Sequence, residues 1–212
     1  MNTKKYRRQE KMDNSFLNSR RDLQIVSRLI EPDSRILDLG CGDGSFLAYL
    51  KRLKNASVLG LELEQSQIGK FIANGVAVIQ SDLNRKLDFA DDKSFDYVIL
   101  SHTLQELENP AELLEEIVRV GKKAVVSFIN FGYFPNRLQL LFSGRMPRNK
   151  SLPHEWYNTP NIHLGTIADF QRLCREKNIK IVQSIALGST WDAPLWFGHN
   201  LFAPGCVFVL SS

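Results

Sequence analysis

Long apolar runs, paired cysteines and metal-binding motifs are missing from this sequence. Its apolar stretches, such as residues 98–100, fall far below the ~20 residues that a membrane-spanning helix needs. The three cysteines, Cys41, Cys174 and Cys206, are an odd number without C-x-x-C spacing, which argues against a disulfide framework and a structural zinc site. Neither an H-E-x-x-H motif nor a Cys/His cluster occurs. We therefore expect no metal, no membrane contact and a location in the reducing cytoplasm.

Excess positive charge is missing from most of the chain. The net charge of +4 comes entirely from residues 1–12, and the remaining 200 residues carry 22 basic and 22 acidic side chains. An enzyme that acts on nucleic acid is expected to carry its basic residues around the active cleft. The sequence therefore predicts a flexible, solvated basic arm at residues 1–20 and disfavours nucleic acid as a partner.

The rest of the chain alternates between strand and helix patterns. With 212 residues and 43% apolar content, it is long enough for one well-buried core, so residues 21–212 are expected to form a single domain. Strands are predicted at 35–39, 57–62, 76–79, 95–100, 124–128, 179–185 and 206–210. Helices are predicted at 21–30, 45–53, 66–73, 110–120 and 168–176. This alternation predicts an α/β fold with a seven-stranded, mostly parallel sheet and helices on both faces.

A glycine-rich turn joins the first predicted strand to the next helix. Gly40, Gly42 and Gly44 carry no side chains, so the backbone N–H groups of the turn can approach a ligand closely. A dinucleotide-binding turn would have glycine or alanine where this chain has Ser45. The spacing therefore disfavours a nicotinamide dinucleotide and favours a ligand without a pyrophosphate.

Acidic residues around the turn narrow the class of ligand. Asp38 precedes the first glycine and can accept hydrogen bonds from an ammonium group, whereas Asp38 and Asp43 would repel a pyrophosphate. We therefore predict S-adenosylmethionine, or its product S-adenosylhomocysteine, whose amino-acid end is a zwitterion. Cys41 is a further candidate contact of this turn, with the alternative that it is only a small residue that fits there.

Two further acids end the second and third predicted strands. Glu62 can accept hydrogen bonds from both ribose hydroxyls of the cofactor, with Leu63 against the adenine face. Asp82 can accept from the adenine amino group, and the amide of Leu83 can donate to the ring. Ligands of open α/β sheets bind at the carboxyl ends of parallel strands, which is where Asp38, Glu62 and Asp82 are all expected.

The loop after the fourth predicted strand supplies the candidate for acid–base chemistry. Ser101 and His102 are expected to face the methyl group of the cofactor, and Ser101 is a candidate cofactor contact. His102 is the titratable side chain of this loop whose ordinary pKa suits a general base. The alternative is that His102 is a polar loop residue without a catalytic role.

The sequence carrying these motifs resembles the MetW family of methionine-biosynthesis proteins, within the class I methyltransferase superfamily. The resemblance is carried by residues 21–23, 35–44, 94–105, 128–132, 144–147, 152–153, 156–163 and 166–170. It implies a Rossmann-like fold and an S-adenosylmethionine-binding accessory protein that activates homoserine O-acyltransferase, a MetX-like enzyme. One alternative is a methyltransferase that acts on a small-molecule acceptor. A nucleic-acid methyltransferase is a third hypothesis, disfavoured by the neutral body of the chain and by the lack of an N/D-P-P-Y motif.

The segment of residues 130–163 is unusually long for a connection within a compact domain, and such connections are usually functional. Its apolar residues predict a helix that caps the cofactor cleft: Phe134, Leu138, Leu141 and Phe142. Arg145 and the neighbouring pair Trp156 and Tyr157 follow. As a lid this segment would enclose a small acceptor, and as an exposed aromatic and basic surface it would dock a protein partner. A second long connection, residues 188–204, is also aromatic.

Overall fold

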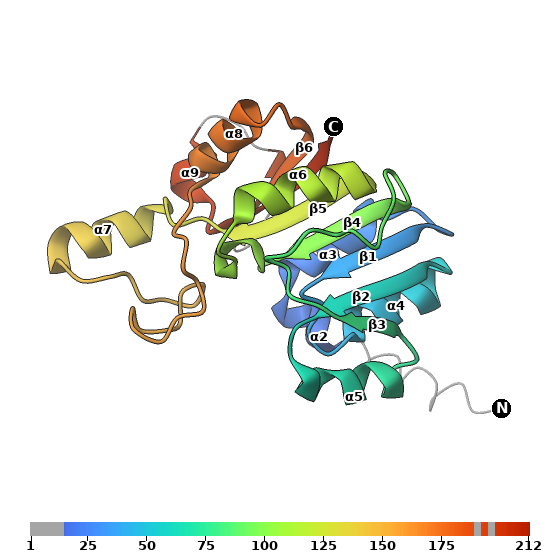
Figure 1. The fold of residues 1–212 in the computed structure, drawn as a ribbon. Coiled ribbons are helices and arrows are strands. Elements are labelled where there is room, and N and C mark those ends of the chain that lie inside the picture. Colours follow the sequence, from blue (N-terminus) through green and yellow to red (C-terminus); the bar gives the residue numbers. More distant parts are fainter. Residues whose placement is uncertain (1–14, 189–191, 195–197) are drawn as a thin grey trace.

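The strands of the protein form one sheet (Figure 1). The structure is a computed structural model, and it describes residues 15–188, 192–194 and 198–212. In these ranges, eight strands are arranged in the order β3-β2-β1-β4-β5-β8-β6-β7. Their bounds are β1 Arg35–Leu39, β2 Ser57–Glu62, β3 Ala77–Gln80, β4 Phe95–Ser101, β5 Gly121–Ile129, β6 Lys180–Leu187, β7 Asp192–Pro194 and β8 Gly205–Ser211. All seven predicted strands are present, and β7 is a short additional strand in the connection 188–204.

The sheet is parallel on one side and mixed on the other. Strands β3, β2, β1, β4 and β5 run parallel to one another. Strand β8 lies antiparallel between β5 and β6, and β7 pairs antiparallel with β6. The predicted mostly parallel sheet is therefore confirmed: it contains the seven expected strands, with β7 as an eighth in the described ranges. Because β1 to β4 are parallel, their carboxyl ends meet at one edge, which brings the predicted site residues to the same side of the sheet.

Every helix predicted by spacing is present within about two residues of its expected bounds. The helices are α2 Ser15–Ser19, α3 Arg21–Leu29, α4 Ser45–Lys54, α5 Gln65–Ala73, α6 Pro110–Val120, α7 Phe134–Ser143, α8 Ile167–Glu176, α9 His199–Phe202 and the 3-10 turn η1 Leu104–Glu106. Local sequence fixes several of these starts. Pro110 occupies the first turn of α6, and Thr166 begins α8 with a capping box in which its hydroxyl accepts from the Asp169 amide at 3.2 Å.

Side chains of the central strands alternate between two cores. Leu37 of β1 and Val98 of β4 pack on the face covered by α6 and α8. Ile36 and Ile99 point to the opposite face, which is covered by α3, α4 and α5. Because successive residues of a strand point to opposite faces, one apolar run fills both cores. The expected helical layers on both faces are therefore present.

The folded part of the chain begins earlier than the predicted boundary at residue 21. Residues 1–14 of the predicted basic arm lie outside the described ranges. Residues 15–20 do not continue as an arm, because Ser15–Ser19 form α2, in which Leu17 is buried, and the Leu17 carbonyl accepts from Nε2 of Gln24 at 2.6 Å. Among the described helices, none combines the length and apolar character needed to cross a membrane.

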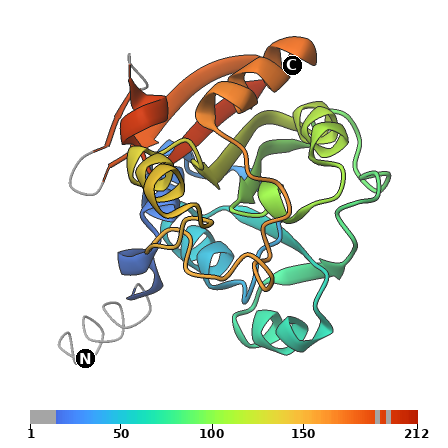
Figure 2. The ribbon, with the colours of Figure 1, turned by 90° about the vertical axis from the view of Figure 1, so that its left-hand side faces the viewer.

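Residues 130–163, hereafter the insertion, leave the sheet at the carboxyl end of β5. The insertion projects beyond the strand ends, with α7 as its most distant element (Figure 1). From that end of the sheet, it lies in front of the strand edge (Figure 2). Asn130 fixes its base: this side chain is fully buried, and its Nδ2 donates to the carbonyls of Asn200 at 3.0 Å and Ala203 at 2.8 Å.

The helix predicted within the insertion is present as α7, and most of its apolar side chains face solvent. Asn136 is its buried residue. The large exposed side chains of this helix are Phe134, Leu140, Leu141 and Phe142, of which Leu141 and Phe142 are 74% and 81% exposed. The insertion therefore presents an apolar surface outside the two cores.

Candidate functional site

The glycine turn lies at the carboxyl end of β1, with φ of +73° at Gly40, +61° at Gly42 and +75° at Gly44. A Cβ on Gly40 would lie 2.5 Å from Oγ1 of Thr103, and one on Gly44 would lie 2.5 Å from the ring of Phe71. A Cβ on Gly42 would meet no heavy atom of the described chain within 4 Å, apart from its chain neighbours. Packing therefore requires Gly40 and Gly44, whereas Gly42 faces open space through which a ligand can approach the backbone.

Asp38 is a buried carboxyl group at the end of β1. It is 4% exposed, and its side chain accepts no hydrogen bond from the residues that the structure describes. Burial raises the pKa of Asp38 to about 7; the carboxylates of Glu62 and Asp22 act in the same direction, and Arg20 opposes them. An unpaired carboxylate in this position is unfavourable, so the group fits a site that a bound ammonium completes.

Backbone amides hold the carboxylate of Glu62 at the end of β2. Its Oε2 accepts from the Gly42 amide at 2.9 Å, and its Oε1 accepts from the amides of Leu63 at 2.9 Å and Glu64 at 3.1 Å. These bonds join β2 to the glycine turn and orient the carboxylate. Because Oε1 already accepts two hydrogen bonds, the predicted contact of both oxygens with a ribose would displace a backbone amide. Oε2 retains room for one hydroxyl.

The residues predicted to meet the adenine lie where β2 and β3 end. Oδ1 of Asp82 accepts from the backbone amide of Asn84 at 2.9 Å and from its side chain at 3.1 Å. The Leu83 side chain is buried in the core, whereas Leu63 is 59% exposed. Leu63 is therefore available to pack against a planar group, and the backbone rather than the side chain of Leu83 is the part that a ligand could meet.

A network that sequence reasoning missed joins α3 to the carboxyl ends of β4 and β5. Asp22 is 2% exposed, and Arg20 donates to both of its oxygens, from Nε at 3.0 Å and from Nη2 at 2.8 Å. The hydroxyls of Ser101 and Ser127 donate to Asp22 at 2.5 and 3.1 Å. Burial alone would raise the pKa of Asp22, but the hydrogen bonds from Arg20 hold it well below its usual range. In this structure Ser101, predicted as a cofactor contact, serves this network.

One signal of the network is present in the sequence. Asp22 precedes Ile25 and Val26 by three and four residues, which places it on the buried face of α3. A carboxylate on an apolar helix face is rarely buried without a partner. The partner Arg20, however, lies in the segment expected as a flexible arm, and Ser127 is far away in the sequence, so spacing alone does not join these residues.

His102 follows β4 in an uncommon backbone conformation, with φ of +61°. Its amide donates to the carbonyl of Ser127 at 3.0 Å, and its Nε2 lies 3.7 Å from Oδ2 of Asp22. Burial lowers the pKa of His102; the charge of Asp22 opposes this effect and that of Arg20 adds to it. The imidazole is therefore mainly neutral at pH 7, which is the form that can accept a proton.

Cys41 packs within the glycine turn. Its Sγ lies 3.1 Å from the carbonyl oxygen of Leu61, and a Cβ on Gly60 would lie 2.5 Å from that sulfur. Burial raises the pKa of the Cys41 thiol, and the charges of Asp38 and Glu62 add to the effect. The side chain is therefore a neutral thiol that fills space between β1 and β2. Within the described ranges, no group of three or more His, Cys, Asp and Glu side chains is placed to hold a metal ion.

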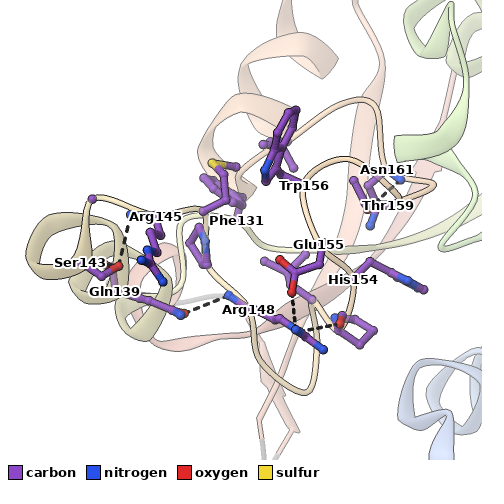
Figure 3. A pocket seen from close by; sticks show the side chains of 16 residues that line it. Phe131, Gln139, Ser143, Arg145, Arg148, His154, Glu155, Trp156, Thr159 and Asn161 are labelled. Atoms are coloured by element: carbon purple, nitrogen blue, oxygen red, sulfur yellow. Dashed lines mark hydrogen bonds and ion pairs between the residues drawn. The ribbon is translucent and has the colours of Figure 1, made fainter.

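The insertion encloses a hollow of about 740 Å³ between α7 and the loops that follow it (Figure 3). Phe131, Met146 and Trp156 contribute apolar surface to it, and Arg145 and His154 contribute polar groups. All of its lining residues belong to residues 131–164. In this structure α7 therefore bounds a hollow formed by the insertion and Leu164, and the glycine turn does not line it.

Solved structures of proteins described as methyltransferases share the fold of this protein. A methyltransferase of Thermotoga maritima described as S-adenosylmethionine-dependent superposes with a TM-score of 0.67 at 16% identity, covering 98% of this chain and 94% of that one. An S-adenosylmethionine-dependent methyltransferase of Mesorhizobium loti gives a TM-score of 0.65 at 18% identity, covering 90% and 98%. At these identities the likeness shows the fold alone, which is the Rossmann-like fold of class I methyltransferases.

The sequence comparisons identify the family within this class. Residues 20–210 match the family model described as methionine biosynthesis protein MetW, and the chain belongs to the MetW family. A bifunctional methionine biosynthesis protein MetXA/MetW of Rhodopirellula baltica is 36% identical over 180 residues, which are 81% of this chain and 28% of that protein. A ubiquinone biosynthesis O-methyltransferase of Hahella chejuensis is 28% identical over 141 residues, which are 62% and 59%. The chain thus spans less than two thirds of the length of either relative.

The contrast between Gly40 and Gly42 gives a prediction about stability. We expect Gly40→Ala to lower the free energy of unfolding by about 1–3 kcal/mol more than Gly42→Ala, because both variants strain a left-handed backbone but the first also collides with Thr103. Urea unfolding followed by circular dichroism measures the difference. Equal losses in the two variants would contradict the packing role assigned to Gly40.

Proposed function

We propose that this protein binds S-adenosylmethionine or S-adenosylhomocysteine at the carboxyl edge of its sheet and acts as an accessory protein of homoserine O-acyltransferase in methionine synthesis. The evidence for this partner is the relative from Rhodopirellula baltica, whose name joins MetXA and MetW in one polypeptide. The evidence for cofactor binding is the unpaired carboxyl group of Asp38, which lies beside a glycine turn that is open at Gly42.

The chemistry of the edge suits the amino-acid end of this cofactor. Asp38 would accept from its ammonium group, and the backbone of the glycine turn would approach it at Gly42, where space is open. Arg20, whose charge acts on Asp38, offers a cation for the cofactor carboxylate. The remaining proposed backbone contacts of the turn are Gly40, Cys41 and Gly44. When bound, S-adenosylmethionine supplies a methyl group on a positively charged sulfur.

The strand ends beyond the turn suit the nucleoside end. Glu62 would accept from a ribose hydroxyl through Oε2, and Leu63 would lie against the adenine. Asp82 would accept from the adenine amino group with the oxygen that Asn84 leaves unused. The Leu83 amide remains the proposed donor to the ring, and Ser101 remains a proposed contact that would act from within the Asp22 network.

The pKa of Asp38 predicts how affinity for the cofactor depends on pH. Below pH 7 the free protein carries a protonated Asp38, and binding an ammonium group requires that proton to leave. Affinity should therefore rise about fivefold from pH 6 to pH 7, with release of a proton, and level off above that range. Calorimetry in buffers of different ionisation enthalpy measures both quantities.

Asp38→Asn is the control for this pH dependence. The variant should bind more weakly and show no rise of affinity between pH 6 and pH 7, because its amide does not titrate. An unchanged pH profile in Asp38→Asn, or a flat profile in the unaltered protein, would contradict the role of Asp38.

The composition of the insertion supports a role in docking a protein. Its charged side chains are mainly basic: Arg137, Arg145, Arg148 and Lys150 against Glu155. Its exposed large side chains include Leu141, Phe142, Trp156 and Tyr157, all at least 70% exposed. Exposed aromatic residues with arginine are typical of the centre of protein interfaces. A partner surface with an apolar centre and acidic rim would be complementary to it.

The docking proposal predicts a complex between this protein and homoserine O-acyltransferase. Trp156→Ala and Phe142→Ser should each weaken it at least tenfold if they supply anchors of about 2 kcal/mol. Ile72→Ser is a matched control, because Ile72 is 72% exposed on α5, outside the insertion. Titration of the acyltransferase by calorimetry measures these affinities.

Titrations at zero and saturating cofactor then measure whether the two ligands are coupled. Coupling must be reciprocal, so cofactor affinity should change by the same factor when the acyltransferase is present. Failure to associate at tens of micromolar would overturn the accessory role, whereas equal weakening by Ile72→Ser would overturn the docking surface.

A second candidate function is methyl transfer to a small molecule, favoured by the neutral His102 held in a strained conformation beside Asp22. His102 would take the proton that a hydroxyl or amine acceptor releases as it gains the methyl group.

The test of this second function is transfer of labelled methyl groups into a metabolite extract. If a methylated product forms, His102→Asn should reduce its rate by about 10²–10⁴-fold, since asparagine tolerates the positive φ but cannot act as a base. A product formed at the unaltered rate by His102→Asn would exclude His102 as the base. Absence of any product would leave the accessory role as the function of the site.

A further inference from the structure

Gln105 connects the loop after β4 to both ends of the insertion. It lies in η1, is 5% exposed, and uses both ends of its side-chain amide. Its Oε1 accepts from the Ile129 amide at 3.0 Å, just before the insertion begins, and its Nε2 donates to the His163 carbonyl at 3.1 Å, where the insertion ends. Its own carbonyl accepts from the amides of Ile162 at 2.8 Å and His163 at 3.0 Å.

The same loop reaches the glycine turn through Thr103. Thr103 packs directly against Gly40, and its Oγ1 donates toward the Leu39 carbonyl at 3.4 Å. Gln105 follows Thr103 in a single 3-10 turn. In this turn the Glu106 amide donates to the Thr103 carbonyl at 3.0 Å. A continuous set of contacts therefore runs from the proposed cofactor site to the base of the insertion through residues 103–105.

The base of the insertion has a second anchor that does not involve this loop. Asn130 donates to the carbonyls of Asn200 and Ala203, on the side of α9 and β8. Arg137 adds a contact inside the insertion, where its Nε donates to the Gly132 carbonyl at 2.6 Å. Changes at these positions loosen the insertion without touching the glycine turn, so the two anchors can be tested separately.

We infer that Gln105 is the positioning residue that links the proposed cofactor site to the insertion, so that occupancy of the site sets how the insertion is presented to its partner. This inference rests on the proposed function and adds a regulatory route to it. A ligand that presses on the glycine turn also presses on Thr103, and the hydrogen bonds of Gln105 carry that displacement to Ile129 and His163 together. Gln105 is buried and both ends of its side-chain amide are hydrogen-bonded, so a shift of this residue is passed to the groups that it contacts.

The experiment is a coupling cycle on the full chain with S-adenosylhomocysteine as the cofactor probe and homoserine O-acyltransferase as the partner. In the unaltered protein, the affinity of each ligand should change with the other present by about 5- to 150-fold. Gln105→Met keeps the volume of the side chain and removes its hydrogen bonds, and it should bring this factor to within about twofold of one. Arg137→Met is the matched control and should leave the factor unchanged, even if it weakens partner binding.

The outcomes separate this inference from the proposed function. No binding of either ligand to the unaltered protein would reject the proposed function. Binding of both with no coupling, or full coupling retained in Gln105→Met, would reject the role of Gln105 alone. If Gln105→Met does not fold, hydrogen exchange on the unaltered protein decides: S-adenosylhomocysteine should slow exchange of the Ile162 and His163 amides, and unchanged exchange would reject the inference.

Discussion

The buried carboxylate of Asp22 is the interaction on which the carboxyl edge of this structure depends. Its hydrogen bonds come from Arg20, from Ser101 at the end of β4 and from Ser127 on β5. Breaking a buried ion pair by removal of one partner typically costs about 3–5 kcal/mol, because the other charge is left uncompensated. The network therefore fixes α3 against the two strand ends from which the His102 loop and the insertion depart.

The same network sets the electrostatics of the proposed cofactor site. Asp22, Asp38, Glu62 and Glu106 gather at one edge, where burial and the charge of Glu62 raise the pKa of both Asp38 and Glu106. Arg20 offsets part of this negative charge through its bonds to Asp22. An edge with this balance disfavours a pyrophosphate and favours a ligand with positive charge near Asp38 and a carboxylate near Arg20. The electrostatics thus agree with the spacing of the glycine turn.

The sequence predicted the sheet well because each core strand carries a short apolar run bounded by turn residues. It predicted the positions of the glycine turn and of Asp38, Glu62 and Asp82, because these lie at or next to strand ends that spacing can locate. It did not predict the role of Arg20, because this residue lies in the segment expected as a flexible arm. It did not predict the engagement of Ser101, because that depends on a contact between distant segments. Strand β7 escaped prediction because it has three residues and ends in proline.

The sequence predicted helix α7 of the insertion, but it did not predict where this helix lies relative to the sheet. A helix of ten residues is marginal in water without packing, and α7 leaves most of its apolar side chains exposed. It is held instead by polar contacts within the insertion: Oδ1 of Asn136 accepts from Asn149 at 2.6 Å, and Nε of Arg137 donates to the Gly132 carbonyl. Arg148 and Glu155 pair across the following loop. An apolar surface that is fixed before binding loses less conformational freedom when a partner covers it. These polar contacts therefore support partner binding, because they hold the exposed aromatic residues in place before a partner covers them.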